Sequence, residues 1–128
     1  MSSVVLDASA VMAVLNQEAG AESLTAEVLI NAVSSTVNVA EVQGKLVQRG
    51  LSPDEAWEAA LIPIREAIVF TADHAKTTGT LISQTRSLGL SLGDRACLAL
   101  ALSLGAPVYT ADRSWKKLKV GVRIHVIR

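Results

Sequence analysis

An almost wholly apolar run from Cys97 to Leu104 constrains the fold more than any other stretch of the chain. A run with so little polar face predicts a helix that is buried on nearly all sides. Pro107 cannot lie inside that helix but can open a strand, so we expect the helix to end before it and a strand to follow over 108–110. Asp94 and Asp112 bracket this helix–strand unit, which places both carboxylates at the edge of a core.

Strand and helix signals alternate along the rest of the chain. This alternation is typical of an α/β fold with a mainly parallel sheet. The length of 128 residues, without a linker or a low-complexity tract, indicates one compact domain over residues 1–128. The predicted strands are 4–6, 33–37, 67–71, 108–110 and 123–127, and the predicted helices are 10–15, 21–32, 39–49, 53–62, 73–88 and 95–104.

Charge and cysteine content limit the partners and the compartment. The formal net charge is zero, which argues against a broadly basic surface, so a nucleic acid would have to be held locally or through a metal. Cys97 is the single cysteine, which rules out an intramolecular disulfide and favours a reducing compartment. No leader pattern and no apolar run of the ~20 residues needed to cross a bilayer is evident. We therefore expect a cytoplasmic protein without membrane contact.

Acidic residues follow two predicted strands at points where open parallel sheets bind ligands. Asp7 follows the strand over 4–6, and Asp112 follows the strand over 108–110. Ligands in such sheets bind beyond the carboxyl ends of the strands, where the strand order reverses. If the order is 3-2-1-4-5, these two strands are neighbours, whereas Asp73 would lie on an edge strand about 10 Å away. The pattern favours Asp112 over Asp73 as the partner of Asp7.

Each of these acids also has a simpler explanation as a helix cap. All four aspartates named above precede expected helix starts, where Asp is a favoured cap. Glu41 with Asn38 resembles a capping box, and it also forms an i, i+4 pair with Lys45. Several carboxylates that converge on one end of a sheet would repel each other, and a hard divalent cation such as Mg²⁺ resolves that repulsion. Convergence is what favours a metal site over capping.

Four short motifs carry most of the functional information. They are Val5-Leu6-Asp7-Ala8-Ser9, Asn38-Val39-Ala40-Glu41, Gly93-Asp94-Arg95-Ala96 and Tyr109-Thr110-Ala111-Asp112. In this order and spacing they resemble the PIN-domain nucleases, and the chain is similar to the VapC toxins of bacterial toxin–antitoxin systems. The resemblance implies a PIN-like three-layer sandwich, with a five-stranded sheet in the order 3-2-1-4-5 and helices on both faces. It also implies an acidic quartet that binds Mg²⁺ or Mn²⁺, formed by Asp7, Glu41, Asp94 and Asp112.

The same resemblance implies an activity and partners. A toxin of this kind is a metal-dependent endoribonuclease that cuts structured RNA, is inhibited by a cognate antitoxin and usually forms a homodimer. Its ion lowers the pKa of a bound water and offsets charge on the phosphate. We expect Asp7 and Asp94 to bind the ion directly, with the other two acids completing its shell or holding its waters. Ser9 and Thr110 are the supporting hydroxyls, although Ser9 fits an ordinary turn equally well.

Positive side chains near the acids are the candidate RNA contacts. Two arginines directly follow proposed ligands, and three lysines lie further along the same segment. A plain solvated surface is the alternative reading of those lysines. Trp115 is able to stack on a base, but core packing explains an aromatic residue in this chain as well. The candidate contacts are Arg95, Arg113, Lys116, Lys117 and Lys119.

Two other functions fit parts of the sequence. A haloacid-dehalogenase-like phosphatase also has Asp after its first strand, but it expects a second Asp two positions on, where this chain has Ser9. A non-enzymatic phospho-acceptor or metal-dependent binding module of similar fold expects an acidic pair at the first strand and a Lys after the last core strand. Neither feature is present at Asp7 or after Thr110. Metal-dependent RNA cleavage is therefore the leading hypothesis.

Overall fold

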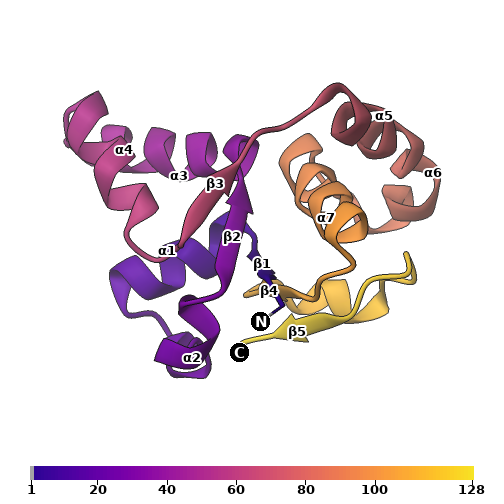
Figure 1. Ribbon diagram of the computed structural model, residues 1–128, viewed down its shortest axis with the longest axis horizontal. Coiled ribbons are helices and arrows are strands. Elements are labelled where there is room, and N and C mark those ends of the chain that lie inside the picture. The colour runs from indigo at the N-terminus through magenta and orange to yellow at the C-terminus, as the bar shows by residue number, and fades with distance from the viewer. Residues whose placement is uncertain (1) are drawn as a thin grey trace.

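A computed structural model describes residues 2–128 and has the layers of an α/β sandwich (Figure 1). Its five strands are parallel and lie in the order β3-β2-β1-β4-β5, which confirms the predicted sheet. The register pairs Val5 with Val108 and Leu6 with Tyr109, so the chain leaves β1 and β4 side by side. The strands are β1 (Val4–Leu6), β2 (Ala32–Ser35), β3 (Glu66–Ile68), β4 (Val108–Thr110) and β5 (Ile124–Val126).

Helices cover both faces of the sheet. One face carries α1 (Ala8–Asn16), α3 (Thr36–Gln48) and α4 (Pro53–Leu61), and the other carries α7 (Leu92–Leu104) with α5 (Ala72–Thr80) packed against it (Figure 1). Within residues 2–128, no helix is long and apolar enough to span a bilayer. The shorter helices are η1 (Ala21–Ser23), α2 (Ala26–Leu29), α6 (Ile82–Thr85), η2 (Arg86–Leu88) and η3 (Arg113–Lys117).

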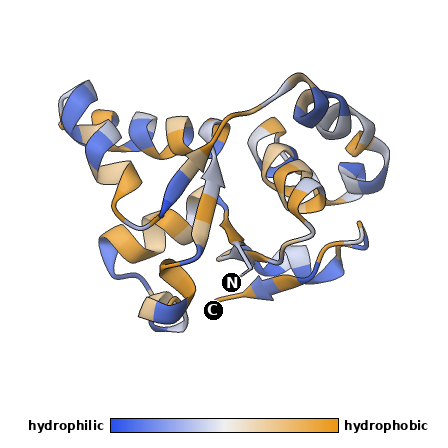
Figure 2. Cartoon of the chain, in the orientation of Figure 1, coloured by the Kyte–Doolittle hydropathy of each residue, from blue (hydrophilic) through white to orange (hydrophobic). Residues whose placement is uncertain are grey.

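Alternation along the short strands divides the core in two. Val5 packs with Val33 and Val108 on the α7 face, whereas Leu6 belongs to the core beneath α1 and α3. Successive strand residues point to opposite faces, so even a strand of three residues contributes to both cores. The predicted burial of the run over 97–104 is confirmed for residues 97–101 but is wrong for the last turn, where Leu102 is 37% and Leu104 is 46% exposed. Figure 2 shows hydrophobic colouring on α7 and mostly hydrophilic colouring on α5.

The predicted start of α3 was wrong because a serine caps the helix earlier. Ser35 accepts a hydrogen bond from Val37 N, and the helix begins at Thr36. The second strand therefore ends at Ser35 and does not extend over 33–37 as predicted. Asn38 lies inside the first turn of α3 and does not cap it, which frees its side chain for tertiary contacts.

The start of α7 was also placed too late. Ser91 and Asp94 form a capping box, so the helix begins at Leu92 and the expected loop over 89–93 is shortened. Reciprocal hydrogen bonds of this kind satisfy backbone donors that a helix start leaves free. Asp94 is therefore the third residue of α7 and does not lie ahead of it. The predicted helix over 73–88 is divided into α5, α6 and η2.

Threonine caps account for two further differences. The predicted helix over 21–32 is broken because Thr25 caps a new short helix, α2, and Ala32 already belongs to β2. The predicted strand over 67–71 is shorter because Thr71 caps α5. The hydroxyl of a capping threonine accepts a hydrogen bond from a backbone N–H of the first turn, so a new helix starts directly after that threonine. These changes shift element boundaries and leave the strand order as predicted.

Two leucines of α7 allow its burial to be tested. Leu98 is 0% exposed, whereas Leu104 on the same helix is 46% exposed. We expect Leu98→Ala to lower the free energy of unfolding by about 2–5 kcal/mol, because it opens a cavity in the core. Leu104→Ala should change it by about 0.5 kcal/mol or less. Urea unfolding followed by circular dichroism measures both, and equal losses would contradict the burial of the middle of α7 and the exposure of its C-terminal end.

Candidate active site

The carboxyl ends of β1 and β4 meet around one buried carboxylate. Asp7 directly follows β1 and is 3% exposed, and Thr110 is the last residue of β4. Asp7 Oδ1 accepts hydrogen bonds from Ser9 Oγ at 2.7 Å and from Ala10 N at 2.8 Å. Asp7 Oδ2 accepts one from Thr110 Oγ1 at 2.6 Å. These donors replace the water that a buried carboxylate loses.

Two hydroxyl groups connect Asp7 to the end of β4. Ser9 Oγ accepts a hydrogen bond from Ala111 N at 2.9 Å, and Thr110 Oγ1 accepts one from Asp112 N at 3.1 Å. Each hydroxyl has a single hydrogen and donates it to Asp7. No hydrogen is therefore left for a bond between Ser9 Oγ and Thr110 Oγ1, which lie 3.3 Å apart. Asp7 Oδ1 receives two donors and Oδ2 receives one. Oδ2 is therefore the oxygen with capacity left for a ligand.

Burial makes the Asp7 carboxyl group a weaker acid than an exposed aspartate. Loss of solvent raises the pKa of Asp7 from its ordinary value of 3.8 to about 6. The three hydrogen bonds described above lower it, but they do not cancel the effect of burial. The nearby charge of Asp94 adds to the rise. A carboxyl group with this pKa changes its charge just below neutral pH, and a neighbouring cation would favour the ionised form.

Three acids lie around the N-terminal end of α7. The carboxylate of Glu41, on α3, lies directly over Gly93, where a Cβ atom would be 2.6 Å from Glu41 Cδ. Burial raises the pKa of the Cys97 thiol in the next turn of α7. The negative charges of Asp7, Asp94 and Glu41 raise it further. Three of the four predicted ligands thus act on the first turns of α7, and Glu41 contacts that helix directly.

The capping interpretation is confirmed for Asp7 and Asp112, whereas α7 is capped by Ser91 and Asp94 is the capping-box partner inside the helix. Asp7 accepts from the backbone at the start of α1. Asp94 Oδ2 accepts from Ser91 N at 3.0 Å, while Ser91 Oγ accepts from Asp94 N at 3.1 Å. Asp112 Oδ1 accepts from Ser114 N at 2.9 Å and from Ser114 Oγ at 2.7 Å. Asp112 thus adjoins the site through its backbone, and its exposed side chain turns towards η3.

The donor chemistry of these residues fits a hard divalent cation. Carboxylate oxygens are the ligands that Mg²⁺ prefers in proteins. Within the part of the chain that the structure describes, the one ion pair joins Arg128 and Glu18, so no Lys or Arg neutralises the four acids at ion-pair distance. Over the same residues, no three acidic, histidine or cysteine side chains are gathered closely enough to hold one ion as they stand. The site therefore carries enough negative charge to bind a cation, but its exposed carboxylates do not lie close enough together to coordinate one ion.

Asn38 was expected only as a helix cap, and its role in the site was not predicted from the sequence. Its Nδ2 donates to Glu41 Oε1 at 2.9 Å and to Gly93 O at 3.0 Å, and the side chain is 1% exposed. The spacing of Asn38 and Glu41 was an available signal, because residues three apart share a helix face. The contact with Gly93 gave no such signal, since it joins two helices across 55 positions.

The basic candidates differ in their accessibility. Arg95 is half-buried and donates from Nη1 to Thr78 O at 2.8 Å, which ties α7 to α5. Trp115 is 1% exposed and packs in the core on the α7 side. Base stacking by Trp115 is therefore wrong as an interpretation, and core packing is right. The exposed basic candidates are Arg113, Lys116, Lys117 and Lys119.

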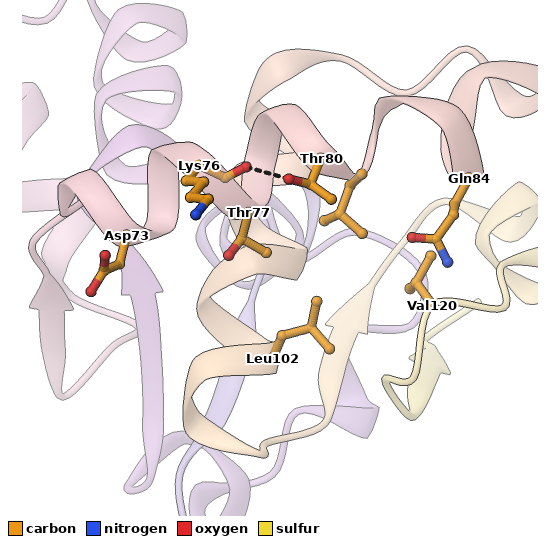
Figure 3. Close-up of a pocket in the computed structure, with 8 residues that line it drawn as sticks. Asp73, Lys76, Thr77, Thr80, Gln84, Leu102 and Val120 are labelled. Atoms are coloured by element: carbon orange, nitrogen blue, oxygen red, sulfur yellow. Dashed lines mark hydrogen bonds between the residues drawn. The ribbon is translucent and has the colours of Figure 1, made fainter.

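An open hollow of about 460 Å³ lies apart from the acidic quartet (Figure 3). None of the four acids lines it. Asp73 lies at one end of the hollow and does not cap α5, because Thr71 does. Asp73 lies in the first turn of α5 and not on the edge strand β3. The lining residues are Asp73, Lys76, Thr77, Thr80, Leu81, Gln84, Leu102 and Val120.

One protein family matches the sequence, and several solved structures match the fold. The family model described as PIN domain matches residues 4–121. No curated protein matches the chain in sequence. DNA-bound VapBC from Salmonella typhimurium is 17% identical, with a TM-score of 0.75 and 100% coverage of both chains.

Two more solved structures show the same likeness. Mycobacterium tuberculosis VapC20, described as a sarcin–ricin loop cleaving toxin, is 22% identical with a TM-score of 0.72 and covers 94% of this chain and 99% of its own. VapBC2 from Rickettsia felis, bound to a fragment of promoter DNA, is 17% identical with a TM-score of 0.72 and 98% coverage of each chain. At these identities, the structural matches establish the fold alone.

The raised pKa of Asp7 predicts a pH-dependent gain in stability from Asp7→Asn. In the wild-type chain the folded-state pKa of about 6 lies above the ordinary value of 3.8. Ionisation of Asp7 therefore lowers the free energy of unfolding, and this loss of stability develops as the pH rises from about 4 through 6. Without metal, we expect Asp7→Asn to raise the free energy of unfolding by about 1–3 kcal/mol at pH 8. The gain should disappear near pH 3, below both pKa values, where the wild-type carboxyl group is mostly protonated in the folded and the unfolded state.

Urea unfolding in EDTA at the two pH values measures this effect. Asp54→Asn is the control, because Asp54 is exposed. A loss of stability in Asp7→Asn at pH 8 would show that hydrogen bonding to the ionised carboxylate outweighs its burial.

Proposed function

The chain belongs to the PIN domain family, and we propose that it is a metal-dependent endoribonuclease that acts as the toxin of a toxin–antitoxin pair. The observation that carries the proposal is the buried Asp7 carboxylate, whose pKa is raised and whose Oδ2 can still bind a ligand. Asp94 and Glu41 add negative charge at the same end of α7. A divalent cation is the group that best stabilises such a set of oxygens.

The four acids have distinct proposed roles. When bound, Mg²⁺ or Mn²⁺ would lower the pKa of a water molecule and offset charge on the scissile phosphate. Asp7 through Oδ2 and Asp94 through Oδ1 are the proposed direct ligands, because each has one oxygen with remaining capacity. The more exposed acids, Glu41 and Asp112, complete the shell or hold its waters.

Neighbouring groups prepare the two direct ligands. Ser9 and Thr110 hold both oxygens of Asp7, and Ser91 N holds one oxygen of Asp94. Carboxylates fixed in this way lose less conformational freedom when they bind an ion. Asp7 must release its proton to act as a ligand, so affinity for the ion should rise as the pH increases through about 6.

The segment after Asp112 supplies positive charge for RNA. Residues 113–128 contain six of the 12 Lys and Arg residues of the chain and no Asp or Glu. Because Asp112 caps η3, this charge begins directly beside the acidic site. Contacts of Lys and Arg with phosphate supply most of the non-specific affinity for nucleic acids. Arg95 is not proposed as an RNA contact, because its guanidinium donates a hydrogen bond to Thr78 O. The proposed contacts are Arg113, Lys116, Lys117 and Lys119.

The solved relatives support the toxin part of the proposal by analogy. One similar structure from Klebsiella pneumoniae is described as a toxin–antitoxin complex, and VapC20 is described as a toxin that cleaves the sarcin–ricin loop. We infer that this chain cuts structured RNA, binds a cognate antitoxin and forms a homodimer, in each case by fold-level analogy. The phosphatase alternative gains no support, because the Ser9 hydroxyl stands where that family requires a carboxyl group and already serves Asp7.

RNA cleavage by the purified, antitoxin-free chain tests the proposed activity. With Mg²⁺ or Mn²⁺ we expect discrete fragments from total cellular RNA, and EDTA should abolish them. Asp94→Asn keeps an oxygen for Ser91 N but removes the charge, so the rate should fall by about 100-fold or more while the fold persists. Asp73→Asn, which changes an exposed acid outside the site, should cleave normally. Intact RNA with a folded, metal-binding protein would reject the activity on these substrates.

The salt dependence of RNA binding tests the basic segment. We expect Lys116→Gln/Lys117→Gln to weaken binding of catalytically inactive Asp94→Asn protein to RNA. The slope of log K against log salt should fall in magnitude by about 1.4, because each of the two lost phosphate contacts removes about 0.7. Lys76→Gln/Arg86→Gln makes the same change in net charge at exposed positions elsewhere and is the control. Equal slopes for the two double variants would contradict a local RNA contact.

A further inference from the structure

We propose that Asn38 and Gly93 are positioning residues that form a seat for the Glu41 carboxylate. This inference rests on the proposed metal-dependent function, and it assigns two residues that are not themselves ligands. Asn38 holds the carboxylate by a hydrogen bond, and Gly93 leaves the space that the carboxylate occupies. The arrangement of Asn38, Glu41 and Gly93 is called the Glu41 seat below.

Gly93 is required for space and not for its backbone conformation. Gly93 is the second residue of α7 and does not have the positive φ that five other glycines of residues 2–128 show. Glycine inside a helix is less favourable than alanine. At Gly93, however, a Cβ atom would overlap the carboxylate of Glu41. By contrast, a Cβ added to Gly44 in α3 would meet nothing within 4 Å.

Asn38 fixes the same carboxylate from the side of α3. Its Nδ2 bridges Glu41 Oε1 and Gly93 O, so one amide group joins the first turns of α3 and α7. Both partners are acceptors, which determines that the amide nitrogen faces them. Within residues 2–128, the buried Oδ1 of Asn38 has no hydrogen-bond partner. A buried acceptor without a partner costs stability, so the bridge from Nδ2 to Glu41 and Gly93 is held at the expense of Oδ1.

The Glu41 seat restricts a side chain that is otherwise free to move. Glu41 is exposed, and a glutamate loses considerable rotamer freedom when it is held in one position. Asn38 and Gly93 remove part of that freedom before any ion binds, and they keep the carboxylate beside the turn that contains Asp94. Loss of the seat leaves all four acids in the chain but allows Glu41 to turn into solvent. Affinity for the ion should then fall while the fold persists.

Binding of Mn²⁺ to the RNA-free protein tests the seat. Isothermal titration calorimetry gives the Kd, electron paramagnetic resonance of free Mn²⁺ gives it independently, and urea unfolding reports on the fold. Gly93→Ala should raise the Kd about tenfold or more and leave the unfolding midpoint unchanged or higher, because alanine favours the helix. Asn38→Ala should raise the Kd similarly. Gly44→Ala, the matched control on α3, should leave it unchanged, and an unaltered Kd in Gly93→Ala would overturn the proposal.

A double-mutant cycle separates the seat from a general effect on structure. If Gly93 acts through Glu41, then Gly93→Ala should cause no further loss of Mn²⁺ affinity in a Glu41→Ala background. An equal loss in both backgrounds would overturn the seat. The wild-type chain tests the proposed function separately. Failure to bind Mn²⁺ and to cleave RNA rejects that function and the seat with it, whereas wild-type binding with unaffected variants rejects the seat alone.

Discussion

The burial of the Asp7 carboxylate is the interaction on which the site depends. A charge that is 3% exposed needs donors in place of water, and they come from both sides of the junction between β1 and β4. Ser9 and Ala10 approach from the start of α1, and Thr110 approaches from the end of β4. The strand ends therefore hold the acid, and the acid holds the strand ends together. The pKa of about 6 shows that these donors do not fully offset burial, so a bound cation would stabilise the folded chain.

Helix capping and the proposed metal binding use the same carboxylates. Asp94 gives one oxygen to Ser91 N, and Asp112 gives one oxygen to Ser114. A carboxylate has two oxygens, so a cap leaves the second available and also limits the rotamers of the side chain. The two explanations of these acids are therefore compatible, because a helix start is a simple way to hold a short acidic side chain at the edge of a sheet. Glu41 has a longer side chain and no cap, which is why it needs the seat.

Features that depend on local pattern could be predicted from the sequence. The bounds of β1 and β4 agree with the structure, since each is a short apolar segment that ends at polar residues, and the resemblance to a known family supplied the strand order. The start of α3 could not be predicted, because Ser35 and Asn38 are both good caps and only packing decides between them. Asn38 found its partner on α7, at Gly93, and no local pattern describes a contact between two helices so far apart in the chain.

The hydrogen bond between Thr110 and Asp7 also bears on when the site can form. The two residues are 103 positions apart, and β1 lies between strands from opposite halves of the chain. Contacts of such long range close large loops, so they tend to form late in folding. During synthesis, β1 and α3 leave the ribosome well before β4 has been made. A chain whose synthesis stops before Thr110 lacks the hydroxyl that holds Asp7 Oδ2, so the carboxylate can be held on both sides only after β4 has been made.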